Sequence, residues 1–288
     1  MDPLPPTLWF LGGLAGLALG RAAVHLAFRA PRLAETDCPA DHGLAGGPVA
    51  LPTLRGRTLR GFYIPPADTP GPAFCMIHGW GANASVMLPL AARLHGHDGR
   101  AVLLLAARNH GDSDADTFSS MPRFAEDLAA GLDWLKQRPE VDPGRLTVAG
   151  HSVGAAAALL CASRRDDVAG VVALSPFAHP NLVMRAYMER GHIPWTPIGR
   201  LISRYVEHII GHRFDDIAPV ATVRRIAAPV LIVHGRDDTV VPPWHAERIA
   251  ENGPTARLVV LPGVDHYATD DLTPVADAIR AFPVGPAS

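Results

Sequence analysis

The protein has 288 residues, of which 48% are hydrophobic and 19% charged, a balance that excludes wholesale disorder and provides for a sizeable core. Its 26 Lys and Arg against 28 Asp and Glu give a formal charge of −2, and basic residues never run longer than two, so the basic stripe of a nucleic-acid binder is missing. The three cysteines, Cys38, Cys75 and Cys161, form no C-x-x-C pair, which argues against a disulfide framework or structural zinc. We expect no metal and no cofactor.

The N-terminal segment is strongly apolar. Residues 3–20 carry no charge, and 18 helical residues span about 27 Å, close to the hydrocarbon thickness of a bilayer. Residues 1–30 are therefore predicted to form a membrane anchor helix, and because Arg21 and Arg29 follow the apolar stretch, the rest of the chain is predicted to be cytoplasmic. Two alternatives are a cleaved signal peptide, which would leave a secreted or periplasmic protein, and a helix packed on the domain.

Residues 31–48 are rich in Pro, Gly and small side chains and are predicted to be a linker, and residues 49–288 a single domain. In this domain short apolar runs alternate with helical patterns, which predicts a mostly parallel, eight-stranded sheet with helices on both faces. Strands are predicted at Leu54–Ile64, Ala73–Ile77, Ala101–Leu105, Arg145–Ala149, Val168–Leu174, Val230–Val233 and Arg257–Leu261. Helices are predicted at Ala84–Leu94, Pro122–Gln137, Ala155–Ser163, Pro243–Glu251 and Pro274–Phe282.

Ligands of such sheets bind beyond the carboxyl ends of the strands, and four motifs follow strands in this way. The first is His78-Gly79-Trp80, directly after the strand that ends at Ile77. A loop in this position supplies a backbone N–H to an oxyanion hole, and we expect the N–H of Trp80 to do so. The indole of Trp80 would then also wall the substrate pocket.

The second motif, Gly150-His151-Ser152-Val153-Gly154, fits G-x-S-x-G and lies between a strand and an Ala-rich helix. A serine on such a tight turn is exposed at the edge of the sheet, which predicts Ser152 as a nucleophile. The N–H of Val153 follows it directly and is the second expected oxyanion donor. A turn that serves only packing is the alternative.

Residues 178–216 are too long for a plain connection and contain apolar residues at helical spacing. They are predicted to form a small helical lid over the pocket, with two surface helices that gate nothing as the alternative. The spaced apolar residues are Ile198, Leu201, Ile202, Tyr205 and Ile209.

The last two motifs follow the final two strands. Asp237 and Asp238 are adjacent, and the Gly-x-x-Asp spacing from Gly235 selects Asp238 as the acid that orients an imidazole. Among 14 histidines, His266 lies on the loop after the last strand, 28 residues beyond Asp238, and is predicted to be the general base. The chain order Ser152, Asp238, His266 is one of the known orders of a catalytic triad.

With these motifs the chain resembles the α/β-hydrolase fold superfamily over roughly residues 50–283. The stretch Arg108-Asn109-His110-Gly111-Asp112-Ser113 is similar to an R-x-H-G-x-S loop of that superfamily, and Ser175-Pro176-Phe177 resembles the segment after its sixth strand. Within the superfamily the chain looks most like the N-terminally anchored hydrolases grouped as Bem46-like and serine aminopeptidase-like. The resemblance implies a Ser–His–Asp hydrolase without a cofactor.

The function expected from these motifs is hydrolysis of a small to medium apolar carboxylic ester through an acyl-enzyme. The expected pocket residues are His78, Gly79, His151, Phe177 and Tyr267. A peptidase or acylaminoacyl hydrolase and a lipid thioesterase are the enzymatic alternatives, and an inactive binding protein on the same fold is the non-enzymatic one. We expect a small-molecule substrate, no nucleic-acid partner, and contact with a membrane through the N-terminal helix.

Overall fold

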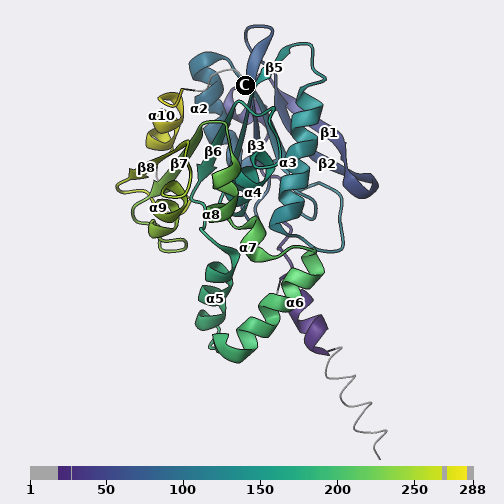
Figure 1. Cartoon of the computed structure of the whole chain (residues 1–288). Coiled ribbons are helices and arrows are strands. Elements are labelled where there is room, and N and C mark those ends of the chain that lie inside the picture. Colours follow the sequence, from purple (N-terminus) through teal and green to yellow (C-terminus); the bar gives the residue numbers. More distant parts are fainter. Residues whose placement is uncertain (1–18, 27, 268–270, 284–288) are drawn as a thin grey trace, which may run out of the picture.

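One eight-stranded sheet forms the centre of the computed structural model, which describes residues 19–26, 28–267 and 271–283 (Figure 1). The strand order is β1-β2-β4-β3-β5-β6-β7-β8, and only the pairs β1/β2 and β2/β4 are antiparallel. The strands are β1 (Gly47–Thr53), β2 (Arg57–Ile64), β3 (Gly71–Ile77), β4 (Ala101–Ala106), β5 (Val141–His151), β6 (Gly170–Leu174), β7 (Val230–Gly235) and β8 (Ala256–Leu261). The predicted α/β-hydrolase architecture is confirmed.

The central strands are buried on both faces because helices cover both. Alternate residues of β3 face opposite sides: Cys75 packs toward α3 and α4, whereas Phe74 and Met76 pack toward α2 and α10. Cys75 is in register with Leu103 of β4 and Val148 of β5, at the middle of the sheet. The helices are α2 (Leu88–Asp98), α3 (Met121–Leu135), α4 (Val153–Ala162), α5 (Pro180–Arg190), α6 (Arg200–Ile210), α7 (Phe214–Ile217), α8 (Pro219–Thr222), α9 (Trp244–Ala250) and α10 (Thr273–Arg280).

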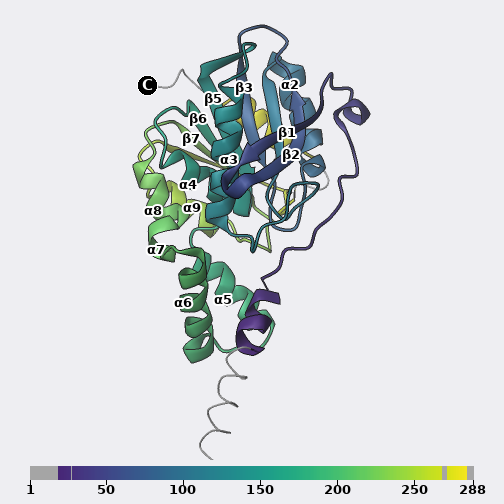
Figure 2. The ribbon, with the colours of Figure 1, turned by 90° about the vertical axis from the view of Figure 1, so that its right-hand side faces the viewer.

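Two helices, α5 and α6, follow β6 and extend away from the body of the molecule (Figure 1 and Figure 2). Helix α6 is amphipathic: Ile202 and Val206 pack against the core cluster, and Leu201 is exposed. The helical residues 19–26 lie beside α6, and His25 Nε2 is 3.1 Å from the Tyr205 hydroxyl (Figure 2). The N-terminal helix therefore touches the segment that was predicted to be a lid.

The predicted membrane anchor and the localisation derived from it need correction. Among the described residues, no helix has the length and apolar character that crossing a bilayer requires. Residues 1–18, which make up most of the predicted span, lie outside the described residues, and the helical residues 19–26 are too few for a span. The prediction of a membrane-anchored protein is therefore not supported.

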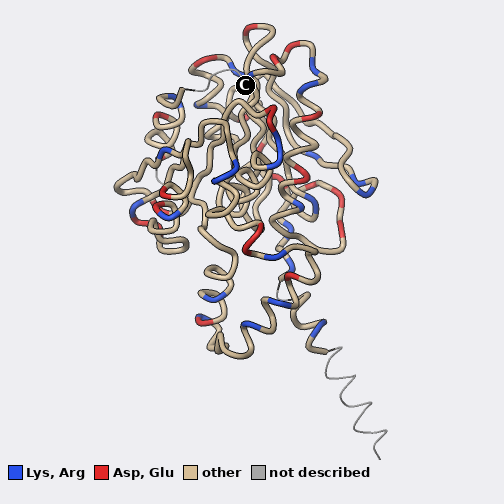
Figure 3. Tube along the Cα trace, viewed as in Figure 1, with Lys and Arg blue, Asp and Glu red and all other residues tan. Residues whose placement is uncertain are grey.

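Acidic and basic residues are interspersed over the described chain rather than sorted to opposite faces (Figure 3). Many pair locally. Arg165, for example, contacts the carboxylates of Asp133 and Asp167, and Asp167 also contacts Lys136. These pairs join the ends of α3 and α4 at the surface, at the opposite end of α4 from the G-x-S-x-G turn.

Candidate active site

The turn between β5 and α4 holds Ser152 in a conformation that non-glycine residues rarely adopt, with φ 54° and ψ −114°. The turn is possible because its two glycines leave room. A Cβ on Gly150 would lie 2.2 Å from the carbonyl oxygen of Gly154, and one on Gly154 would lie 2.4 Å from that of His78. The Ser152 N–H donates to the carbonyl of Leu174 on β6 at 2.8 Å. This strained turn from strand to helix, which we call the elbow, is the geometry that would expose a serine as a nucleophile.

Asp238 and His266 meet beyond the ends of β7 and β8. His266 Nδ1 lies 2.6 Å from Asp238 Oδ2, and both side chains are buried. Because a carboxylate only accepts, Nδ1 carries a proton, so in the neutral ring the lone pair is on Nε2. Asp238 Oδ1 accepts the N–H groups of Val240 and Val241 at 2.9 and 2.7 Å. Its neighbour Asp237 is exposed, so the structure brings Asp238, not Asp237, to the imidazole.

A second histidine, His234, contacts the same carboxylate and was missed by the sequence analysis. Its Nε2 lies 2.7 Å from the carbonyl oxygen of Val241 and 3.2 Å from Asp238 Oδ2. Nε2 must carry the proton because a carbonyl only accepts, so His234 donates toward Asp238. Burial acts to raise the pKa of the Asp238 carboxyl, but the hydrogen bonds from His234 and His266 outweigh it and hold this pKa well below its usual range. The sequence does contain a signal for this contact, because His234 lies at the end of β7 and only four positions before Asp238.

The loop after β3 is held from within by His78. This side chain is fully buried, its Nδ1–H donates to the carbonyl of Gly79 at 2.6 Å, and its Nε2 accepts the N–H of Ala107 at 3.1 Å. Burial, assisted by the nearby His110, lowers the pKa of His78 to about 3, so the ring stays neutral. It thus acts as a strut between the loops after β3 and β4. His78 is therefore a support of the loop rather than a wall of an open pocket.

The residues predicted to supply the oxyanion donors, Trp80 and Val153, lie on the loop after β3 and at the start of α4. Trp80 follows Gly79, and a Cβ built on Gly79 would lie 3.4 Å from the Cβ of Ser152. Val153 opens α4, so its N–H has no partner four residues back within the helix. The indole of Trp80 is 40% exposed, enough to face an incoming molecule.

The remaining predicted pocket residues differ in their surroundings. His151 Nε2–H donates to the carbonyl of His266 at 2.7 Å, which ties the elbow to the loop of the predicted base. Burial and the neighbouring His266 lower the pKa of His151 to about 4. Tyr267 is exposed and its ring lies 5.8 Å from that of His151, whereas Phe177 is buried in the main core cluster.

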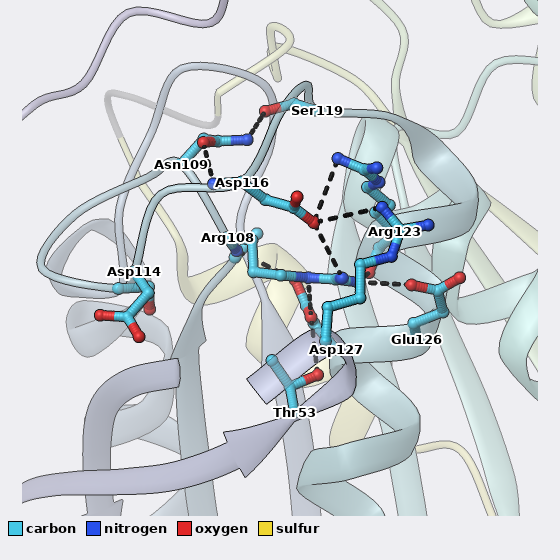
Figure 4. Close-up of polar contacts among 12 residues, drawn as sticks. Thr53, Arg108, Asn109, Asp114, Asp116, Ser119, Arg123, Glu126 and Asp127 are labelled. Atoms are coloured by element: carbon cyan, nitrogen blue, oxygen red, sulfur yellow. Dashed lines mark hydrogen bonds and ion pairs between the residues drawn. The ribbon is translucent and has the colours of Figure 1, made fainter. Parts of the chain in front are cut away.

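The loop between β4 and α3 is anchored by Arg108, whose side chain is almost completely buried (Figure 4). Its Nε lies 2.7 Å from Asp127 Oδ1, and its two terminal nitrogens reach Asp116 at 3.3 Å and Glu126 at 2.6 Å. Asp116 also accepts from Arg123 at 3.1 Å. Each buried charge of this network therefore contacts a group of opposite charge. These contacts fix the start of the loop. Among residues 19–26, 28–267 and 271–283, no cluster of His, Cys, Asp and Glu is arranged to hold a metal ion.

Comparisons with known proteins agree with this fold. The chain is 33% identical over 242 residues to an uncharacterized protein of Mycobacterium tuberculosis. The match covers 83% of this chain and 79% of that protein. It is 34% identical over 134 residues to a thiohydrolase of Arthrinium phaeospermum, 46% of this chain and 43% of that one. A solved esterase of Pyrococcus furiosus superposes with a TM-score of 0.68 at 23% identity, over 88% of this chain and 96% of its own.

The model of the prolyl oligopeptidase family matches residues 123–280, more than half of the chain. This stretch contains the elbow, Asp238 and His266. The narrower resemblance to Bem46-like hydrolases stays a prediction. The chain belongs to the prolyl oligopeptidase family and is a serine hydrolase of the α/β-hydrolase fold.

Proposed function

We propose that the protein hydrolyses carboxylic esters through an acyl-enzyme, with Ser152 as nucleophile, His266 as general base and Asp238 as the acid that orients it. The observation that carries this proposal is the buried 2.6 Å contact between His266 Nδ1 and Asp238 Oδ2. It leaves the Nε2 lone pair free, and the His266 backbone is hydrogen-bonded to the residue before Ser152.

In the proposed mechanism the Ser152 hydroxyl attacks the acyl carbonyl while His266 Nε2 takes its proton. The N–H groups of Trp80 and Val153 bind the oxyanion of the tetrahedral intermediate. Collapse of this intermediate breaks the bond to the alcohol, which takes the proton from His266. Water then attacks the acyl group with His266 as base, and Ser152 is released with its proton. Asp238 stays ionised throughout, because its pKa lies well below the usual range.

The proposed substrate is a small to medium apolar ester, and helices α5 and α6 form the proposed lid. Arg190, at the end of α5, approaches the carbonyl of Thr239 at 3.4 Å, which puts α5 next to the loop that carries Asp238. Exposed aromatic surface on Trp80 and Tyr267 supports an apolar substrate group.

Peptide or acylaminoacyl hydrolysis is the second candidate, because the matching family model is that of prolyl oligopeptidases. The same triad would serve an amide, an ester or a thioester, so substrate geometry outside the triad decides between them. Thioester hydrolysis is favoured by shorter matches to fungal thiohydrolases, which cover less than half of the chain.

The test is hydrolysis of p-nitrophenyl esters from C2 to C16 by the full chain, alongside an aminoacyl p-nitroanilide and an acyl thioester. We expect ester turnover that peaks at one chain length and falls by at least about 10³-fold in Ser152→Ala. Ser163→Ala, at the far end of α4, is the matched control and should keep full activity. A fluorophosphonate should label the wild type and Ser163→Ala but not Ser152→Ala. Unchanged ester turnover in Ser152→Ala would overturn the proposal, and faster anilide than ester turnover would favour the peptidase.

A further inference from the structure

The segment that precedes the domain, residues 30–37, is packed against two loops of the candidate active site; we call it the N-terminal strap. The sequence predicted most of it to be a linker. Instead Ala30 is buried, and the strap exchanges hydrogen bonds with the loops after β3 and after β4. In Figure 2 the chain runs from the N-terminal helix beside α6 along the edge of the body before it enters β1.

Arg32 binds the loop after β4. Its Nε–H donates to the carbonyl of Gly111 at 2.8 Å, and one terminal N–H donates to the carbonyl of Ser113. Gly111 has φ 47°, and a Cβ there would lie 2.3 Å from a carboxylate oxygen of Glu35. The positive φ favours a glycine at this position, and the Glu35 carboxylate occupies the space that a side chain would take.

Glu35 binds the loop after β3. Its carboxylate accepts the N–H of Ala84 at 3.1 Å and that of Ser85 at 2.7 Å, where the 3-10 turn Ser85–Met87 leads into α2. Asn83 adds a third contact, donating from its side-chain amide to the carbonyl of Ala34 at 2.6 Å. Glu35 is partly buried, and a carboxylate that accepts two backbone N–H groups restrains a loop more firmly than a neutral acceptor does.

Trp80 is close to both of the loops that the strap holds. Gly81, the next residue, has φ 73°, and a Cβ on it would lie 2.7 Å from the ring of Pro31 in the strap. On its other side, the ring of Trp80 packs edge-on against His110, a residue of the loop that Arg32 holds, with 6.0 Å between ring centroids. The strap therefore fixes both the backbone after Trp80 and the surface under its side chain.

We propose that Arg32 and Glu35 are positioning residues of the reaction: through the strap they hold the Trp80 N–H where the oxyanion forms. This inference rests on the proposed function of Trp80 as an oxyanion donor. Oxyanion donors are effective only when they are fixed before the charge develops, and displacement of one donor reduces kcat while leaving ground-state binding largely intact.

The experiment compares Glu35→Ala and Glu35→Gln with Asp37→Asn in the full chain. Asp37 is the matched control because it lies on the same strap but contacts His42, at 3.1 Å, instead of the loop. We expect kcat for the best ester to fall about tenfold or more in Glu35→Ala with KM within about twofold. Glu35→Gln, which keeps one acceptor oxygen, should fall between, and Asp37→Asn should match the wild type.

Hydrogen exchange gives a readout that does not depend on catalysis. The amides of residues 79–87 should exchange faster in Glu35→Ala than in the wild type, while those of α4 stay unchanged. Should Glu35→Ala fail to fold, Arg32→Lys provides the test from the other attachment, since it keeps the charge but donates to fewer carbonyls. The proposal would be overturned if the folded variants kept the kcat of the wild type. It would also be overturned if Asp37→Asn lost as much kcat as Glu35→Ala, or if kcat fell without faster amide exchange. If instead the wild type neither hydrolyses esters nor reacts with a fluorophosphonate, the proposed function fails, and the exchange data still report on the strap.

Discussion

Asp127 and Asp238 are two buried carboxylates near the carboxyl ends of the strands, and they differ in the kind of side chain that pairs with them. Asp127 is paired with the guanidinium of Arg108, a cation at every pH at which the protein is folded. Asp238 is paired with His266 and His234, rings that are able to be neutral or charged. Burial raises the pKa of the Asp127 carboxyl to about 6 against the opposing effect of Arg108, whereas that of Asp238 lies well below its usual range.

The comparison shows how similar buried pairs serve different ends. The Arg108 guanidinium keeps its charge, and its contacts with Asp116, Glu126 and Asp127 fix the backbone between β4 and α3 (Figure 4). In the Asp238 pair the carboxylate stays ionised and accepts from His266 Nδ1, which leaves the second ring nitrogen, Nε2, outside the contact. We therefore expect damage to the first pair to appear in stability and damage to the second in catalysis.

The largest expected effect is that of Asp238→Asn. An amide at this position is able to donate to Nδ1, which would favour the wrong tautomer of His266 and remove the lone pair from Nε2. We expect kcat/KM for the best p-nitrophenyl ester, measured per folded molecule, to fall by about 10³- to 10⁴-fold. Asp237→Asn is the control, since Asp237 is exposed, and should retain wild-type kinetics. Equal losses in the two variants would contradict the assignment of Asp238.

Asp127→Asn should show the reverse pattern. It leaves the buried guanidinium of Arg108 without its fully buried carboxylate partner and should reduce the free energy of unfolding by about 3 to 5 kcal/mol. Turnover per folded molecule should stay within about twofold of the wild type, measured below the melting transition against active-site titration. Asp133→Asn removes an exposed partner of Arg165 and should cost less than about 1 kcal/mol. A large fall in kcat of Asp127→Asn at full folding would contradict the division between the two pairs.

His78 tests what a buried imidazole costs when no carboxylate is paired with it. Its pKa is about 3 in the folded protein and near 6.5 in the unfolded chain, so below pH 6.5 the unfolded state binds a proton that the folded state rejects. Stability should therefore fall as the pH falls, and His78 alone should account for about 2 kcal/mol between pH 7 and pH 5. His78→Gln should lose less stability over this interval in urea titrations, and exposed His97→Gln should behave as the wild type. The same pH dependence in all three proteins would exclude this role for His78.

The main features of the fold could be predicted because each depends on local patterns. Fully apolar runs such as Ala101–Leu105 are typical of strands buried on both faces, and the structure has β4 at Ala101–Ala106. The Gly-x-Ser-x-Gly spacing predicted the elbow because steric limits act within five residues, as the positions of Gly150 and Gly154 show. The Gly-x-x-Asp spacing likewise led to Asp238, the residue that meets His266.

What could not be predicted depends on contacts between distant residues. Glu35 and Ser85 are 50 positions apart, and no periodicity in a segment of Pro, Gly and small residues indicates that it packs on a loop. The role of His234 as a second donor to Asp238 depends on a backbone carbonyl that the fold brings to its ring. The anchor prediction was wrong for the described residues, where no helix is long and apolar enough to span a bilayer. Hydropathy also gave no sign of the contact between His25 and Tyr205 of α6, which are 180 positions apart.

The smallest expected effect is that of an exposed ion pair. It shows how much of the strength of the Asp127 and Asp238 pairs is due to their burial. Arg185 and Glu189 lie at i, i+4 on α5, with 2.7 Å between the charged groups and more than half of each side chain exposed. Water screens this pair and both side chains lose rotamer freedom in making it, so a double-mutant cycle with Arg185→Ala and Glu189→Ala should give a coupling of about 0.3 to 0.5 kcal/mol. A coupling above about 1.5 kcal/mol would show that an ion pair can be strong without burial. Burial would then not explain the strength of the Asp127 and Asp238 pairs, and the geometry of their contacts would have to explain it.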